Sequence, residues 1–332
     1  MLYTFQKVIQ DYDPLPSSQS SSPSKTKDIR FSIEHDLLKP AFNYLSNKCR
    51  THSVTMGNAF TSLKKFILDL DRDLNLDVIK ELCSDEIDRY IQEQIIFADK
   101  AISKHACMKI VDGDVILTYA NSEVIQALLL HAQRKFETEK KSFRVIVVDS
   151  RPLLEGRKML DVFTKAGIEC SYIFLNSLSY VMKEVTKVFL GAAALMSDGS
   201  ILSRVGTASV ALMTQSNNIP VLICCESYKI TSRVQLESIT SNELGNPDDL
   251  LSTHCAIDRS RIETISTNVN HQNEPLQEWR SVKTLKLLNL LYDLTPSEYV
   301  SAIVTEYGIL PPTSVAVLLR EMNPQDNETT FA

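Results

Sequence analysis

In the second half of the sequence, short apolar segments alternate with stretches of helical periodicity, and this alternation is the feature that most constrains the fold. The apolar segments are VILTYA (115–120), RVIVVD (144–149), CSYIFL (170–175), KVFLGAAALM (187–196), PVLICC (220–225) and SAIVTEYG (301–308). Most of them are apolar on both faces, which is typical of strands buried inside a parallel sheet. Helices are predicted between them over 122–139, 152–165, 178–184 and 203–215. The alternation predicts right-handed βαβ crossovers and an α/β domain built on a doubly wound, mainly parallel Rossmann-like sheet.

The sequence before this region has helical rather than strand periodicity. Residues 30–109 contain a single glycine and a single proline, and apolar residues recur at helical spacing, for example at Phe60, Leu63 and Ile67. This pattern predicts about four packed helices. We therefore predict an N-terminal helical domain over 29–110 and the Rossmann-like domain over 111–322. A short segment with a Ser/Pro-rich linker is predicted over 1–28, and a tail over 323–332.

The composition argues against several classes of function. The net charge is −6 and the isoelectric point is about 5.6, so no direct nucleic-acid partner is predicted. No apolar run approaches the roughly 18 residues that span a bilayer, so no membrane partner is predicted either. The seven cysteines are an odd number without a C-x-x-C pair, which indicates reduced thiols in a cytosolic protein. The six histidines show no metal-ligand spacing and no Gly-rich nucleotide loop follows a strand, so neither a metal nor a cofactor is predicted.

Ligands of such sheets bind beyond the carboxyl ends of the strands, and two of these ends carry candidate binding residues. Asn121 follows the first strand, where it could bind a ligand or, alternatively, stabilise the turn. After the second strand, the string DSRPLLEGRK supplies Arg151, Arg157 and Lys158 near the start of a helix, which favours a bound phosphate. The alternative is a solvated basic turn whose cations pair with neighbouring acidic residues.

A third strand end, VFLGAAALMSDGSILSRVGT (188–207), has the form of a ligand site without catalytic side chains. Gly191 indicates a close backbone approach, and Asp198-Gly199 is typical of a turn. Ser203 and Gly206 lie near the start of a predicted helix, which suits an anion, whereas helix capping with a packing glycine is the alternative. No nucleophile or general acid or base is evident at these strand ends.

Five strings of this sequence occur in the same order as in a known family. They are VILTYANSE, VVDSRPLLEGR, FLGAAALMSDGSILSRVGTASVAL, IPVLICCESYK and NLLYDLTPSEYVSAIVTEYGILPP. They resemble the family that joins the alpha, beta and delta regulatory subunits of translation initiation factor 2B to sugar-phosphate isomerases. These isomerases include methylthioribose-1-phosphate isomerase and ribose-1,5-bisphosphate isomerase. The resemblance extends over residues 30–321.

The resemblance implies that the catalytic side chains of the isomerases are missing. In the isomerases, the first string holds a catalytic cysteine in Thr-His-Cys-Asn, and the third holds an aspartate in Gly-Ala-Asp. The corresponding residues here are Ala120 and Ala193, while Asn121 is retained. A methyl group can neither shuttle a proton nor carry charge, so a non-catalytic protein is expected. The phosphate-binding string is partly kept, through Arg151, Gly156 and the basic residues that follow.

Within the family, the chain resembles the delta branch most, through DSRPLLEGR, CCESYK, SNELGNPDDL and the C-terminal strings. The resemblance implies a regulatory subunit of the guanine-nucleotide exchange factor for initiation factor 2, which forms its hetero-oligomeric core and senses the phosphorylated alpha subunit of initiation factor 2. The implied partners are the beta subunit by direct pairing, the alpha, gamma and epsilon subunits, and initiation factor 2. Delta members typically have a long basic N-terminal extension, so a short or truncated form is expected here.

The last apolar block of the sequence supplies candidate subunit contacts. Part of this block is expected to complete the core, and the surplus could face another subunit. The candidates are Leu291, Tyr292, Leu294, Tyr307 and Ile309. Two alternatives to the regulatory role stay open. One is a sensor that binds a sugar phosphate or nucleotide without reacting it, and the least favoured is an active ribose-phosphate isomerase with a relocated acid or base.

Overall fold

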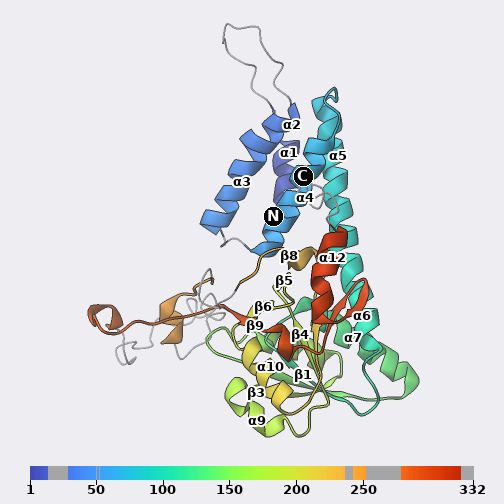
Figure 1. Ribbon diagram of the computed structural model, residues 1–332, viewed down its shortest axis with the longest axis vertical. Helices are drawn as coiled ribbons and strands as arrows, with labels where there is room; N and C mark the ends of the chain where they lie inside the picture. The colour runs from blue at the N-terminus through green and yellow to red at the C-terminus, as the bar shows by residue number, and fades with distance from the viewer. Residues whose placement is uncertain (14–28, 50, 52, 236–241, 252–277, 323–332) are drawn as a thin grey trace. The chain divides into compact units, whose positions relative to one another are not determined.

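The computed structural model describes residues 1–13, 29–49, 51, 53–235, 242–251 and 278–322 (Figure 1). The chain divides into two compact units, Met1–Ala98 and Asp99–Ala332. Each unit has its own buried apolar cluster or clusters. The predicted boundary near residue 110 differs from this division, because Ile102, Ala106 and Cys107 pack into the core of the second unit.

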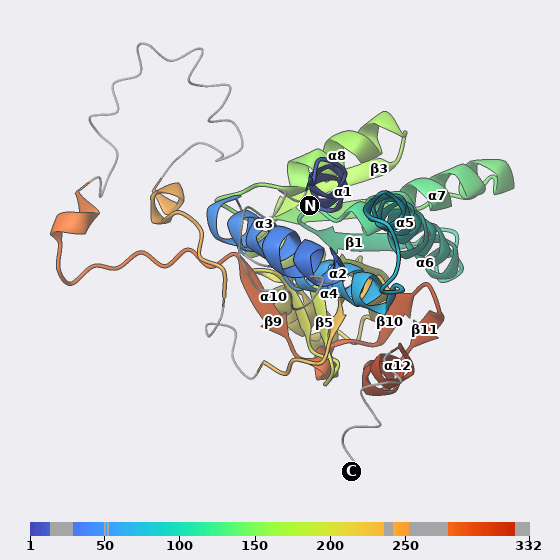
Figure 2. The same ribbon diagram turned by 90° about the horizontal axis from the view of Figure 1, so that it is seen from above.

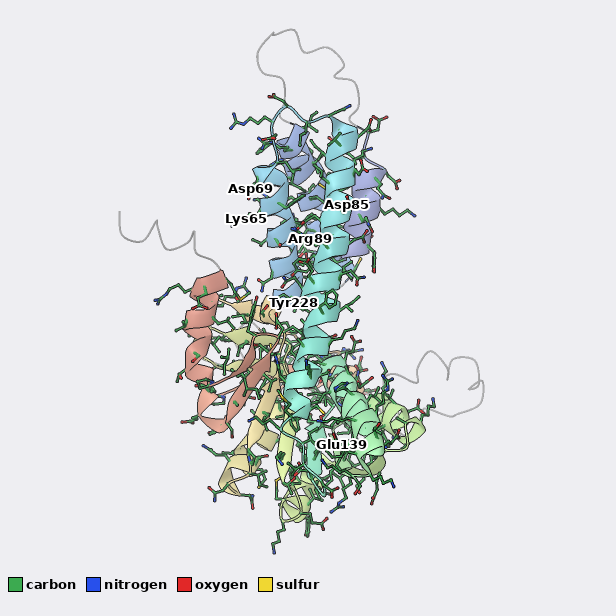
Figure 3. All side chains as sticks on the ribbon, turned by 90° about the vertical axis from the view of Figure 1, so that its right-hand side faces the viewer. Lys65, Asp69, Asp85, Arg89, Glu139 and Tyr228 are labelled. Carbon is green, nitrogen blue, oxygen red and sulfur yellow. The ribbon has the colours of Figure 1, made fainter. Side chains whose placement is uncertain are left out.

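The first unit is helical, as its periodicity predicts. Its helices are α1 (Leu2–Gln10), α2 (Ile29–Ser32), α3 (Lys39–Tyr44), α4 (Val54–Asp69) and α5 (Leu76–Tyr90), with π-helical segments η1 (Ile33–Leu38), η2 (Leu45–Cys49) and η3 (Ile91–Phe97). Helix α5 buries Ile79, Cys83 and Ile87, which are four residues apart and therefore lie on one face. The charged side chains of Lys65 and Asp69 lie on the exposed side of α4 (Figure 3).

The second unit is built on a mainly parallel, seven-stranded sheet. Its strands are, in order across the sheet, β11 (Gly308–Leu310), β10 (Ala302–Thr305), β7 (Val221–Cys224), β4 (Lys187–Gly191), β1 (Val115–Tyr119), β2 (Arg144–Asp149) and β3 (Glu169–Phe174). All neighbouring pairs are parallel except the edge strand β11, which runs antiparallel to β10. The doubly wound, mainly parallel sheet predicted from the sequence is therefore confirmed.

Helices cover both faces of this sheet and create two apolar cores. The helices are α6 (Ala98–Cys107), α7 (Glu123–Glu139), α8 (Gly156–Lys165), α9 (Leu178–Val181), α10 (Thr207–Ser216) and α12 (Val315–Met322). Short 3-10 turns are η4 (Leu175–Ser177), η5 (Ser227–Lys229), η6 (Pro247–Leu250), η9 (Trp279–Ser281), η10 (Ser297–Tyr299) and η11 (Pro312–Ser314). Helices α7 and α8 lie on one side of β1 and α10 on the other (Figure 2), and each side buries its own cluster. The adjacent residues Cys224 and Cys225 are fully buried in opposite clusters, as expected for successive positions of a strand.

A second, four-stranded sheet was not foreseen from the sequence. Its order is β8 (Ile230–Thr231), β5 (Ala194–Met196), β6 (Ile201–Arg204) and β9 (Tyr292–Thr295). The prediction of one strand over 187–196 is wrong, because the chain leaves the large sheet after Gly191 and pairs with β6 from Ala194 onward. The predicted turn at Asp198-Gly199 joins β5 to β6, with Gly199 at a φ of +81°.

Two predicted helices begin later than expected. Helix α8 starts at Gly156 rather than at residue 152, because Leu154 has a φ of +51° and a left-handed residue cannot continue a right-handed helix. Helix α10 starts at Thr207 rather than at residue 203, because Ser203 and Arg204 pair with β9 as part of β6. Because both helices start later, residues 150–155 form a loop, and this loop and the end of β6 lie at the edge of the sheet where ligands bind.

Candidate functional site

A pocket lies at the carboxyl ends of the parallel strands, the location in which such sheets bind ligands. Its cavity has a volume of about 20 Å³, which is room for about one water molecule. The lining comes from the ends of β1 and β2, the loop that follows β2, the end of β6 and residues 289–291. Side chains from segments far apart in the sequence therefore fill most of the space at this edge.

The two alanines that the resemblance matches to catalytic residues of the isomerases both lie shortly after strands of the large sheet. Ala120 follows β1, is buried, lines the pocket and has a φ of +54°. Ala193 lies between β4 and β5, where its N–H donates to the carbonyl oxygen of Leu202 at 2.9 Å, and it is not part of the pocket lining. Neither side chain can donate, accept or hold a proton, so these positions provide no acid, base or nucleophile.

The candidate phosphate-binding residues do not converge on the pocket. Arg151 lines it, while Arg157 and Lys158 are exposed on the first turn of α8 and are not part of the lining. Gly156 is buried, and a Cβ there would lie 2.8 Å from Cγ of Asp149, so this glycine permits close packing of α8 against β2. The three cations of this string are thus divided between one pocket residue, Arg151, and two solvent-facing ones.

Asn121 takes part in the turn rather than in the pocket. Its Oδ1 accepts a hydrogen bond of 2.6 Å from Nε2 of Gln126 in α7, and it does not line the cavity. This geometry favours the turn-stabilising alternative for Asn121. Gly191 makes the close approach that its place in a strand indicates, because a Cβ there would lie 2.2 Å from Oγ of Ser122.

Tyr119 lies at the end of β1 as its place in the sequence indicates, but the sequence predicted no role for it. Its hydroxyl lies 2.6 Å from Oγ of Ser150 and also donates to the carbonyl oxygen of Val205. A Cβ on Gly206 would lie 2.3 Å from the same hydroxyl, so the tyrosine packs tightly against the turn before α10. Burial raises the pKa of Tyr119 to about 12, so the phenol is neutral. The ring and its hydroxyl occupy space that a ligand would need.

Arg204 and Glu155 form a two-point ion pair at the mouth of the pocket. Nε and Nη2 of Arg204 donate to the two carboxylate oxygens of Glu155, each at 2.8 Å. The guanidinium also lies 5.0 Å from the centre of the Tyr292 ring, which is within cation–π range. Burial lowers the pKa of Arg204, but the carboxylate of Glu155 outweighs it and the net shift is upward. Both partners line the pocket, so the half-buried cation of Arg204 already has an anion.

Asp293 provides a second internal carboxylate, at the amino end of α10. Its Oδ2 accepts the backbone N–H groups of Gly206 and Ala208 at 2.7 and 3.0 Å. The side chain of this β9 residue therefore satisfies two of the donors that a helix leaves unpaired at its start. Burial raises the pKa of Asp293 to about 6, although the two N–H groups favour the ionised form.

The raised pKa of Asp293 predicts a measurable pH dependence of stability. Between pH 4 and 6 the folded chain holds a proton that the unfolded chain has released, so this group stabilises the fold at low pH and the contribution is lost as the pH rises through 6. The free energy of unfolding of Asp293→Asn minus that of wild type should therefore increase by roughly 1–2 kcal/mol from pH 4.5 to pH 7.5. Chemical denaturation at both pH values measures this difference. Asp161→Asn, an exposed carboxylate of α8, is the control, and a flat difference for Asp293→Asn would contradict the assignment.

A further buried ionic group lies at the end of β7. Glu226 and Lys229 form an ion pair of 2.6 Å, and their side chains are 6 % and 16 % exposed. Burial, together with the carboxylate of Glu226, raises the pKa of Asp99 to about 7, while Lys229 lowers it. Tyr228, labelled in Figure 3, belongs to the same turn and lies 5.8 Å from Nζ of Lys229. The sequence gives no local sign of this group, because Asp99 is far from Glu226 along the chain.

The candidate interface residues fall into two places. Tyr292 and Leu294 lie on β9, beside Leu291 in the pocket lining, whereas Tyr307 and Ile309 lie at the hairpin between β10 and β11. Near the hairpin is an open groove of about 450 Å³, formed by β11 and α12. Its lining includes Tyr307, Leu310, Val317, Leu318 and Met322. Tyr307 is 59 % exposed and Val317 is 51 % exposed, so these two side chains of the lining are largely uncovered by the described residues.

The described residues show neither a metal site nor a membrane-spanning helix. Among those residues, no three histidine, cysteine, aspartate or glutamate side chains gather in a way that could hold a metal ion. None of the helices drawn for the described ranges is both long and apolar enough to cross a bilayer. The described cysteines are free thiols, and Cys255 lies outside the described residues.

Comparisons with known proteins are consistent with this geometry. The model of the Initiation factor 2 subunit family matches residues 1–312. The chain is 42 % identical to the Dictyostelium discoideum "Translation initiation factor eIF2B subunit delta" over 322 residues, which is 97 % of this chain and 47 % of that relative. It thus spans about half the length of this curated relative. It is also 28 % identical to the ribose 1,5-bisphosphate isomerase of Pyrococcus furiosus over 233 residues, 69 % of this chain and 64 % of the isomerase.

A solved structure resembles the fold over most of the chain. It is the crystal structure of the tetrameric eIF2B-beta2-delta2 complex from C. thermophilum. The similarity covers 92 % of this chain and 83 % of the chain in that complex, with a TM-score of 0.70 and 28 % sequence identity. The helical unit and the mainly parallel sheet therefore recur together in a known protein.

Proposed function

Because this chain belongs to the Initiation factor 2 subunit family, we propose that it is a non-catalytic regulatory subunit of the guanine-nucleotide exchange factor for initiation factor 2, of the delta type. One observation carries the proposal: the strand-end pocket, where isomerase chemistry would occur, has a methyl group at Ala120 and is filled by Tyr119. The chain keeps the scaffold of a ligand-binding sheet without groups that move protons. The identity to a named delta subunit over 97 % of the chain supports the same role.

We propose the beta subunit as the direct partner. The solved complex that resembles this chain contains beta and delta subunits in equal number. The alpha, gamma and epsilon subunits and initiation factor 2, including its phosphorylated alpha subunit, follow as further proposed partners. The setting proposed for this assembly is the cytosol, in keeping with the free thiols of the described cysteines.

The apolar groove between β11 and α12 is the surface that we propose for subunit contact. Tyr307 and Val317 expose more than half of their side chains there, beside the buried Leu318. Exposed aromatic and aliphatic side chains around a concave surface are typical of protein interfaces. Ile309 packs mainly on the core from the same hairpin, so we assign it a supporting role.

Co-purification with the beta subunit tests the assembly. The two chains are expected to elute together from size exclusion as a stable hetero-oligomer, and a delta chain that elutes alone would count against the proposal. Tyr307→Asp places a charge in the groove and should weaken the pairing by at least about thirtyfold, since a buried aromatic anchor contributes about 2 kcal/mol or more. Tyr180→Asp is the matched control, because Tyr180 on α9 is 84 % exposed and outside the groove.

The two alternative functions remain predictions with less support. An active isomerase would require an acid and a base near Ala120, and turnover of a ribose 1-phosphate derivative by the purified chain would establish it. A sugar-phosphate sensor would require room for a ligand, and the pocket has a cavity of about 20 Å³. Calorimetry with a sugar phosphate, using Arg151→Ala as the control, decides whether such a ligand binds.

A further inference from the structure

Two arrangements that proteins use to bind anions lie close together at the strand-end pocket: the first lines the pocket, and the second directly follows Val205 of its lining. The first is the guanidinium of Arg204, whose planar fork of N–H donors matches the oxygens of a phosphate or carboxylate. The second is the amino end of α10, where unpaired N–H groups and the helix dipole attract negative charge. Val205 lies between the two and lines the pocket together with Arg204. A phosphate monoester at this position would find both donors within one short stretch of chain.

In this structure each arrangement already holds an anion, and the anion is a side chain of the chain itself. Glu155 takes two N–H groups of Arg204 with both of its oxygens. Asp293 takes the N–H groups of Gly206 and Ala208 with one oxygen, Oδ2. Its other oxygen, Oδ1, is buried without a hydrogen-bond partner among the described residues, and the side chain is only 9 % exposed. Burying a carboxylate oxygen without a hydrogen-bond partner costs free energy, so the position of Asp293 is not explained by favourable solvation of its own side chain.

We propose that Glu155 and Asp293 are built-in anions that close the strand-end pocket to phosphate monoesters. They compete for the same donors that a soluble phosphate would use. Because both are attached to the chain, neither loses translational freedom when it binds, whereas a free ligand does. A millimolar ligand therefore cannot displace them easily. The inference concerns the pocket and is independent of subunit assembly, so either can fail without the other.

Tyr119 reinforces the closure by taking up volume. Its hydroxyl donates to the carbonyl oxygen of Val205 and contacts Oγ of Ser150, which joins the turn before α10 to the end of β2. The three side chains hold the loop after β2, the end of β6 and the start of β9 together. Removing the charge of Glu155 is expected to release Arg204 without disturbing the hydrogen bonds of Tyr119.

Titration of the full chain with inorganic phosphate tests the proposal. Wild type should give no binding heat, whereas Glu155→Gln should bind phosphate, and Glu155→Gln with Asp293→Asn should bind it at least about tenfold more tightly than Glu155→Gln alone. Adding Arg204→Gln to the double variant should abolish the gain. Glu184→Gln is the matched control, because Glu184 also pairs with an arginine, Arg144, but does not line the pocket.

Three results would overturn the proposal. Wild type could bind phosphate as tightly as the double variant, the folded variants could gain no binding, or the gain could survive Arg204→Gln. Thermal unfolding of each variant shows whether it is folded. Glu155→Gln alone carries the test if the double variant does not fold, because it leaves the Asp293 cap of α10 in place.

Discussion

Replacing Asp114 by alanine is expected to lower the free energy of unfolding by about 3–5 kcal/mol, since it leaves a partly buried ammonium without its partner. The carboxylate of Asp114 is 4 % exposed and accepts from Nζ of Lys187 with both oxygens, each at 2.7 Å. It also accepts from the hydroxyl of Thr186 and the N–H of Val111, each at 2.7 Å. These bonds join the starts of β1 and β4, at the edge of the sheet opposite the pocket.

Chemical denaturation measures the effect, and a surface ion pair provides the control. Asp161 and Lys165 on α8 lie 2.6 Å apart but are 61 % and 73 % exposed, so Asp161→Ala should change stability by only about 0.5 kcal/mol. The double change Asp114→Ala with Lys187→Met should recover part of the loss, because it removes the stranded charge. Equal effects of Asp114→Ala and Asp161→Ala would show that the buried pair contributes no more than a surface one.

The strands of the large sheet could be predicted because their signal is local. The string RVIVVD coincides with β2, and VILTYA and CSYIFL match β1 and β3 within one residue at each end. Buried parallel strands are apolar on both faces, so a short window of sequence contains the evidence. The helical unit was predictable for a similar reason, because its apolar residues repeat every three or four positions along α4 and α5.

The contents of the pocket could not be predicted, because its partners are far apart in the sequence. Arg204 meets Glu155 from 49 residues away, and Asp293 meets Gly206 from 87 residues away. Nothing in the string DSRPLLEGR shows that its glutamate, rather than its arginines, would make the main ionic contact of the site. The small sheet was missed on the same ground, since β6 is short and its pairing with β9 is decided by tertiary contacts.

The positions of the two alanines illustrate both outcomes. The strand assignment placed Ala120 at the end of β1, where the structure has it, whereas Ala193 was predicted within a strand over 187–196 and lies instead between β4 and β5. What the pattern could not show is that Tyr119, next to Ala120, would turn its hydroxyl toward Val205 and Ser150. The loss of an acid and the filling of the pocket are therefore separate features, and only the first can be inferred from the sequence.

Replacing Gly206 by alanine is the second change expected to have a large effect, a loss of about 3–5 kcal/mol in the free energy of unfolding. Gly206 has a φ of +107°, which L residues rarely adopt, and it precedes the first turn of α10. A Cβ at this position would lie 2.3 Å from the hydroxyl oxygen and 2.7 Å from Cζ of Tyr119. The ring would have to move and lose its bonds to Val205 and Ser150.

Gly113 allows the two causes of this effect to be separated. Gly113 also has a positive φ, +79°, but a Cβ there would meet nothing within 4 Å. Gly113→Ala should therefore cost only the backbone strain, about 1–2 kcal/mol, and the excess at Gly206 reports the collision with Tyr119. Tyr119→Phe removes the hydroxyl oxygen, the atom nearest to the added Cβ. In a double-mutant cycle, the variant with both Gly206→Ala and Tyr119→Phe should therefore lose less unfolding free energy than the sum of the two single losses. Full additivity would mean that Tyr119 does not fill the pocket beside α10, and the closed pocket would then have to be explained without it.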